Sequence, residues 1–221
     1  MDIKGYMLLA VLAIGLPALY YAVHVWNKPY FELEKNRNRI IFRSVPEYIV
    51  IFLGETALFK IWYEYQTGEI SGLILGLLYT VLVIMCVLCM TDYWETLVPN
   101  RILLLCIVCC FLELGIWCVR DMAVITEILP SMILGLIFCM LSFGMGYLLS
   151  KGSMGSGDVK LALVLGMFLT GEYVVRTVFF GCLISAFYSM IQLLRKKLNR
   201  KDEIPFVPFL YIGLIITYLV G

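Results

Sequence analysis

Two aspartates lie at the ends of apolar stretches, where a charged side chain is costly and is a functional candidate by default. Asp92 follows the apolar run 71–90, and Asp158 opens the shorter apolar run 158–170. Two carboxyl groups that meet in a site of low dielectric constant do not both ionise easily, so they tend to share one proton. One carboxylate can then take a proton from water while the other acid protonates a carbonyl oxygen. That chemistry hydrolyses a peptide bond without a metal or a covalent intermediate.

The segment before Asp158 is rich in glycine. Gly152, Gly155 and Gly157 permit backbone conformations that other residues resist, and they let another chain approach closely. Asp158 is expected where a helix begins, near the positive end of its dipole. Either aspartate alone could be only a helix cap, and the glycines could serve only helix packing. The pair beside one glycine-rich segment favours catalysis, although the sequence does not say which aspartate is base and which is acid.

The elements that must position these aspartates are membrane-spanning helices. The 221 residues are 62% hydrophobic and 15% charged, with a mean hydropathy of +0.94, which is more apolar surface than one soluble core can hide. A spanning helix needs about 20 mostly apolar residues. We therefore predict an all-α polytopic membrane protein with about eight transmembrane helices, over 5–26, 45–65, 71–90, 101–119, 125–149, 158–170, 174–194 and 204–220.

The whole chain, 1–221, is predicted to be a single membrane-embedded domain. Residues 1–44 form its first span and a short basic loop, and residues 45–221 form its core. The first apolar run is long enough to span the bilayer and lacks a small-residue cleavage site, so we interpret it as a retained helix rather than a signal peptide.

The basic residues predict the orientation of these spans. The loops on one side contain all seventeen Lys and Arg residues except Lys4, Lys60, Arg120 and Arg176. Because cytoplasmic loops are enriched in Lys and Arg, that side is predicted to be cytoplasmic and both termini to lie outside a plasma membrane. The loops concerned are 27–44, 91–101, 150–160 and 195–203. Both aspartates are then expected near the cytoplasmic face.

Two cysteine pairs have a spacing that resembles a zinc site. Cys86-x-x-Cys89 and Cys106-x-x-Cys109 each lie within an apolar run, without the turn residues that shape a zinc knuckle, so no metal and no cofactor is predicted. The net charge of +1 gives no general attraction for nucleic acid, and no nucleic-acid partner is expected. The expected partners are the lipid bilayer and a protein substrate. The oligomeric state stays open.

Several segments together resemble one family of membrane proteases. Residues 155–161, Gly-Ser-Gly-Asp-Val-Lys-Leu, resemble the motif of the GxGD-type aspartyl proteases, and specifically the type IV prepilin peptidases. Asp92 with Val-Pro-Asn at 98–100 resembles that family's first catalytic aspartate and its downstream Ile-Pro-Asn, with valine where isoleucine is usual. Ile-Pro-Phe-Val-Pro-Phe at 204–209 resembles the last-helix motif. The similarity covers roughly residues 45–220.

The resemblance implies catalytic roles for Asp92 and Asp158. It also implies a group of residues that shape the site or bind the substrate, namely Gly155, Gly157, Lys160, Pro99 and Asn100. The implied substrates are prepilins or pseudopilins, cut after a short basic leader and before a hydrophobic helix. Whether they serve a type IV pilus, protein secretion or DNA uptake stays open. Many members also methylate the new N-terminus and carry a cysteine-containing insert. The loop 27–44 has no cysteine, so methyl transfer is not predicted.

Two other functions remain as alternatives. The first is another GxGD intramembrane protease, similar to presenilin or signal peptide peptidase, although the 204–209 segment and the small size favour the prepilin type. The second is a small proton-coupled transporter that uses Asp92 and Asp158 as a relay.

Overall fold

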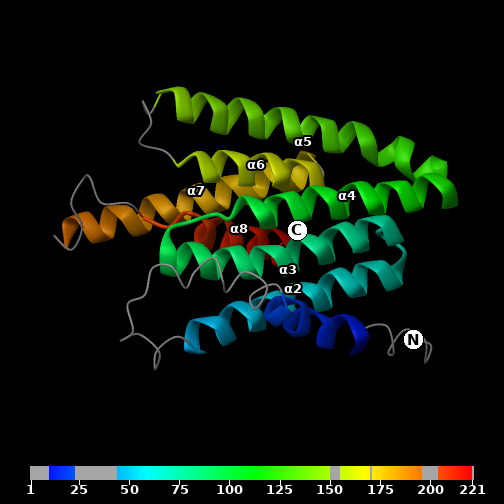
Figure 1. Ribbon diagram of the computed structural model, residues 1–221, viewed down its shortest axis with the longest axis horizontal. Coiled ribbons are helices and arrows are strands. Elements are labelled where there is room, and N and C mark those ends of the chain that lie inside the picture. The colour runs from blue at the N-terminus through cyan, green and yellow to red at the C-terminus, as the bar shows by residue number, and fades with distance from the viewer. Residues whose placement is uncertain (1–9, 23–43, 150–154, 170, 196–203, 221) are drawn as a thin grey trace.

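The structure is a computed structural model that describes residues 10–22, 44–149, 155–169, 171–195 and 204–220. Within these residues the chain forms eight helices and no strand (Figure 1). The helices are Ala10–Ala22, α2 (Ser44–Thr67), α3 (Gly72–Glu95), α4 (Asn100–Arg120), α5 (Met122–Leu149), α6 (Ser156–Phe168), α7 (Gly171–Leu194) and α8 (Val207–Val220). Each of the eight predicted segments therefore contains a helix.

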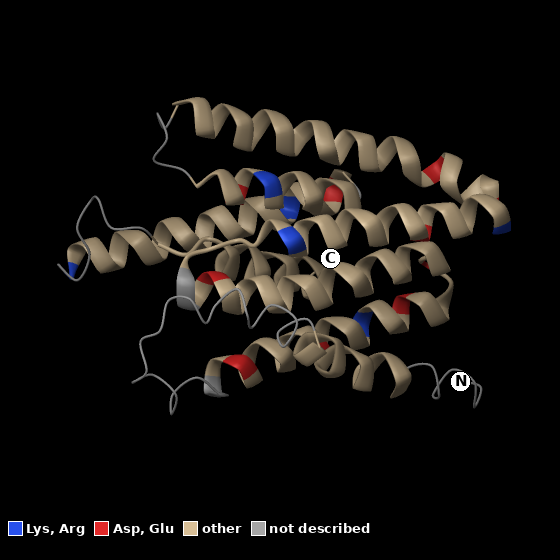
Figure 2. Ribbon diagram, viewed as in Figure 1, with Lys and Arg blue, Asp and Glu red and all other residues tan. Residues whose placement is uncertain are grey.

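Four of these helices, α3, α4, α5 and α7, are long and apolar enough to cross a membrane. Helix α5 carries one charged residue, Glu127, along its 28 residues (Figure 2). The first helix and α8 are apolar but shorter. Helix α6 has 13 residues, and a helix of that length measures about 20 Å, less than the roughly 30 Å of a bilayer's hydrocarbon core. The prediction of an all-α polytopic membrane protein is confirmed.

Helix α3 is the central helix of the bundle. In its most apolar stretch 78% of the residues are buried, against 22%, 28% and 17% in α4, α5 and α7. The outer helices instead expose large apolar side chains, such as Phe111 on α4 and Leu148 on α5. In water such faces would be unstable, whereas lipid is their natural solvent. An aspartate on α3 is therefore held inside the protein.

Glycines bring two pairs of helices into close contact. A Cβ atom added to Gly135 of α5 would lie 2.8 Å from the carbonyl oxygen of Gly166 on α6. A Cβ atom added to Gly213 of α8 would lie 2.5 Å from the carbonyl oxygen of Thr177 on α7. Small residues allow such backbone approach in membrane helices, where packing rather than hydrophobicity drives association. These contacts fix α6 and α8 on their neighbours.

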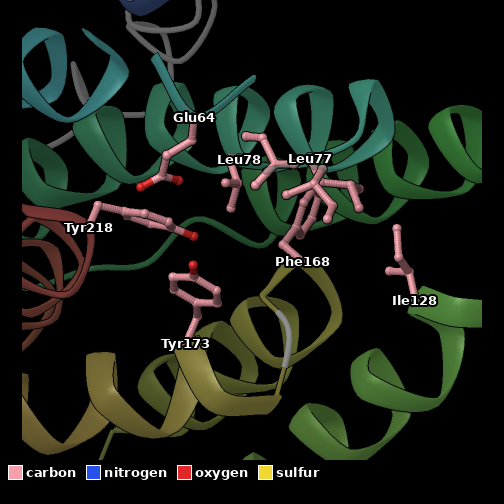
Figure 3. A pocket seen from close by; sticks show the side chains of 9 residues that line it. Glu64, Leu77, Leu78, Ile128, Phe168, Tyr173 and Tyr218 are labelled. Carbon is pink, nitrogen blue, oxygen red and sulfur yellow. The ribbon is translucent and has the colours of Figure 1, made fainter. Parts of the chain in front are cut away.

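The end of the bundle opposite Asp92 holds a small cavity of about 40 Å³. Glu64 of α2, Tyr173 of α7 and Tyr218 of α8 point toward one another there (Figure 3), and the two tyrosine rings stack with centroids 5.3 Å apart. The α3 residues that line this cavity belong to the first two turns and a half of the helix, far from its last turn. The cavity is therefore separate from both aspartates.

Candidate active site

Asp92 lies in the last turn of α3 and is 4% exposed. The helix continues to Glu95 and ends at Thr96, which adopts a left-handed conformation (φ 51°) and donates its backbone N–H to the Asp92 carbonyl oxygen at 2.9 Å. Pro99 then precedes Asn100, the first residue of α4. Because proline lacks an N–H group and restricts the residue before it, the chain breaks its helix here and turns back.

The carboxylate of Asp92 meets the start of α8. The backbone N–H of Val207 donates to Asp92 Oδ2 at 2.9 Å, and the Phe206 backbone also hydrogen-bonds this carboxylate. Val207 is the first residue of α8, so its N–H has no acceptor within the helix. Pro205 and Pro208 explain why a helix starts here, since proline is tolerated in the first turn and not in the interior.

The sequence does not predict this contact, and residues 204–209 stand out in it only through their resemblance to a last-helix motif. The two prolines indicate a helix start, and an exposed helix start attracts a carboxylate. Nothing in the spacing of the sequence, however, indicates which carboxylate lies there.

Asp158 lies in the first turn of α6, outside the four helices that are long enough to cross a membrane. Its backbone N–H donates to the Gly155 carbonyl oxygen at 3.2 Å. Burial raises the pKa of the Asp158 carboxyl group to about 6, and the negative charge of Asp92 contributes to the rise. The two carboxyl groups are thus close enough to interact electrostatically, although they come from distant parts of the chain.

The two glycines of this segment provide space rather than unusual backbone angles. Gly155 has an ordinary φ of −62°, and a Cβ atom there would lie 3.3 Å from Asp158 Oδ2. A Cβ atom on Gly157 would lie 3.1 Å from Cβ of Val98 in the α3–α4 connection. Their small size therefore lets the start of α6 approach that connection and leaves room beside the Asp158 carboxyl group. Gly152 lies outside the described residues.

Lys160 and Asn100 come together on the face of α6 that contacts α4. Lys160 Nζ donates to Asn100 Oδ1 at 3.2 Å. Both residues line an open groove of about 420 Å³, whose other lining residues are apolar. These are Leu103, Leu104, Ile107, Leu136, Leu163, Val164 and Met167. The groove therefore combines a polar end with apolar walls.

The cysteines of the two CxxC pairs are thiols within helices. Cys86, Cys89 and Cys106 are buried, and Cys86 Sγ lies 3.2 Å from the hydroxyl group of Tyr211. In the part of the chain that the structure describes, no group of three or more His, Cys, Asp or Glu side chains is arranged to hold a metal ion.

The fold and the site define a polytopic helical membrane protein. One of its carboxyl groups is buried in the central helix, a second lies at a helix start beside glycine, and the two are close enough to interact electrostatically. The family model described as the type IV leader peptidase family matches residues 77–190, more than half of the chain and a range that contains both aspartates. The chain belongs to the type IV leader peptidase family. The resemblance seen in the sequence is thereby confirmed.

One curated relative is the prepilin leader peptidase/N-methyltransferase of Bacillus subtilis (strain 168), which is 34% identical over 73 residues. The aligned stretch covers 33% of this chain and 29% of that relative, so the similarity spans less than a third of the relative's length. No solved structure matches the chain.

Proposed function

We propose that this protein is an aspartic endopeptidase that removes the basic leader from type IV prepilin-like proteins. The observation that carries the proposal is the interaction of Asp92 with Asp158 at one end of the bundle, in a chain of the type IV leader peptidase family. The relative from Bacillus subtilis is named for the same processing step. In this proposal both aspartates are catalytic and no cofactor takes part.

The chemistry follows from one proton shared by the two carboxyl groups. The ionised carboxylate activates a water molecule, and the protonated carboxyl group polarises the scissile carbonyl by donating to its oxygen. Gly155 leaves space for an extended substrate backbone beside Asp158, and Gly157 shapes the site by letting α6 approach Val98 in the α3–α4 connection. Pro99 ends the connection that positions Asp92 relative to α4.

The groove beside Lys160 and Asn100 suits the apolar part of such a substrate. Its polar end lies within one helical turn of Asp158 along α6, and its walls are aliphatic. An amphipathic or apolar helix is commonly bound in a groove of this kind. We propose that Lys160 and Asn100 contact the substrate where its chain leaves the site.

The site is proposed to face the cytoplasm. The loops that are rich in Lys and Arg lie at the same ends of the predicted spans as both aspartates, and such loops are retained on the cytoplasmic side. Both termini are then outside, the protein is a multi-pass protein of the plasma membrane, and residues 45–221 form the peptidase core of a single domain. The substrate's leader is reached from the cytoplasm.

The test is co-expression of the full chain with a prepilin. Asp92→Asn and Asp158→Asn should each reduce cleavage by roughly 10²- to 10⁴-fold, because each removes one half of general acid–base catalysis. The matched control is Asp121→Asn, which changes an exposed aspartate whose Oδ1 accepts from the Ala123 N–H at a helix start. Full cleavage by either active-site variant at normal expression would contradict the proposal, and proton-coupled flux without cleavage would favour a transporter.

A further inference from the structure

The connection between α6 and α7 lies within the length of the bundle rather than at its end. Gly166, near the end of α6, packs against Gly135 at the middle of α5, where an added Cβ atom would lie 2.8 Å from the Gly166 carbonyl oxygen. The Gly171 N–H at the start of α7 donates to Ser131 Oγ of α5 at 3.0 Å. Helix α5 is long enough to cross a membrane. Ser131 and Gly135 lie roughly 14–20 Å along it at a rise of about 1.5 Å per residue, so the connection is at membrane depth.

Backbone that leaves a helix at this depth must have its polar groups satisfied by protein or by water in an internal cavity, since lipid cannot satisfy them. Ser131 satisfies the Gly171 N–H. The cavity described above lies directly beside the same connection, because Phe168, the last residue of α6, and Tyr173, in the first turn of α7, both line it. Its other lining residues belong to α2, α3, α5, α8 and the α2–α3 connection. The cavity therefore lies among the helices of the bundle.

One hydroxyl group in this cavity is buried and unsatisfied. Tyr218 of α8 is 1% exposed, and its hydroxyl group forms no hydrogen bond with any residue that the structure describes. Tyr218, Tyr173 and Glu64 point toward one another across the cavity (Figure 3). A buried tyrosine hydroxyl group normally has a partner, because without one it forfeits the hydrogen bonds that it makes with water in the unfolded chain. The Tyr218 hydroxyl group thus requires a partner other than a neighbouring side chain.

The size and the charge of the cavity fit water. The centre of a water molecule can lie within a volume of about 40 Å³, and about 10–15 Å³ is enough for one molecule, so about two or three fit. Glu64, Tyr173 and Tyr218 provide the two to four polar partners that a buried water molecule uses. Lys60 Nζ lies 3.8 Å from the Glu64 carboxylate and offsets its charge, which favours a neutral ligand over a cation.

We propose that this cavity is a binding site for ordered water, in which about two or three molecules bridge the Tyr218 and Tyr173 hydroxyl groups and the Glu64 carboxylate. The Tyr218 hydroxyl group donates to one of these molecules, and water in turn donates to Glu64. The water molecules thereby link α2 to α7 and α8 at the depth of the α6–α7 connection. This site is independent of the proposed peptidase activity.

Radiolytic footprinting tests the site in the full chain in detergent. A short X-ray pulse converts bound water to hydroxyl radicals, so a buried side chain is oxidised only where water lies beside it. Tyr211 is the matched control: it is also 1% exposed, but its hydroxyl group donates to the Val50 carbonyl oxygen at 2.7 Å and it does not line the cavity. Both tyrosines lie in the tryptic peptide that follows Lys201. We expect Tyr218 to be oxidised several-fold faster than Tyr211, and equal protection of the two would overturn the proposal.

The melting temperature gives a second test, because the sign of its change differs between a hydrated and a dry cavity. Tyr218→Phe removes the hydroxyl group and keeps the ring. It should lower the melting temperature if water loses a partner, and raise it if an unsatisfied polar group is removed from a dry site. Tyr211→Phe, which loses a direct hydrogen bond, should lower it, and Tyr63→Phe, at an exposed tyrosine, should leave it unchanged. A Tyr218→Phe protein that melts at or above the wild-type temperature would rule out the water site.

Discussion

The raised pKa of Asp158 gives this residue a pH-dependent effect on stability. Its carboxyl group titrates near 6 in the folded protein because of burial and the Asp92 charge, against about 3.9 in an unfolded chain. Between these values the folded state binds more protons, so the contribution of Asp158 to the free energy of unfolding falls as the pH rises. The loss begins near pH 4 and is complete above pH 6 to 7.

Asp158→Asn should therefore gain melting temperature relative to the wild type as the pH rises. We expect little difference near pH 4 and a constant advantage for the variant above about pH 7, because asparagine has no charge to bury. Thermal unfolding in detergent at several pH values measures this, with Asp121→Asn as the control on an exposed aspartate. A melting-temperature difference that does not change with pH would mean that the Asp158 pKa is not raised.

The sequence predicts those site residues that are marked by a pattern among their immediate neighbours in the chain. Asp92, Asp158 and their neighbouring glycines are visible because a charge interrupts an apolar run, and the structure brings them to one end of the bundle. Their catalytic roles stay predictions. The contact of Asp92 with Val207 was not predictable, because it joins positions 115 residues apart through packing of α3 and α8.

At the level of the helices, α8 positions Asp92 only as long as it packs closely on α7. Gly213 lies against backbone atoms of Thr177 and Gly181, which cannot rotate away as a side chain could. A larger residue at this position must displace the whole of α8, including the Val207 N–H group that donates a hydrogen bond to Asp92. The contact between α7 and α8 is thus part of what shapes the site.

Gly213→Val should destabilise the protein by about 1–3 kcal/mol or more and reduce cleavage per folded molecule. The reason is that the added side chain would overlap backbone atoms, which cannot move aside without shifting a helix. Gly144→Val is the matched control, since a Cβ atom at that glycine of α5 meets nothing within 4 Å. Unfolding in detergent and cleavage of a prepilin, each corrected for protein amount, measure the two effects. Equal behaviour of the two variants would show that α7 and α8 adapt to the added volume.

The helices also show where apolar patterns stop being informative. The long apolar segments of α4, α5 and α7 predict those helices well. A long apolar segment in lipid must form a helix, because its backbone groups have no water with which to form hydrogen bonds. Helix α3 was predicted to end at residue 90, where hydrophobicity stops, yet it continues to Glu95. Backbone hydrogen bonds extend the helix beyond the apolar run to the left-handed Thr96, so Asp92 lies within α3 instead of in the following loop.

For the whole molecule, the distribution of basic residues predicts that Ser156 faces the cytoplasm and Asp121 faces outside. Both residues are exposed; Asp121 directly precedes α5, and Ser156 is the first residue of α6, the helix that follows α5 in the chain. Ser156→Cys should resist a membrane-impermeant thiol reagent in intact bacteria and react after the cells are opened, whereas Asp121→Cys should react in both. Mass spectrometry of the peptides distinguishes these sites from the native cysteines. The reverse pattern would place the aspartates outside and remove access to a cytoplasmic leader.

The hydrogen bond between Asp92 and Val207 has a consequence for how the protein is made. The carboxylate belongs to the third helix of the described bundle, and its donor belongs to the last one. A nascent chain that has released its first seven helices from the ribosome already contains both aspartates, but one of them still lacks the backbone group that orients it. Under the proposed function, cleavage is therefore expected to begin only after α8 has entered the membrane.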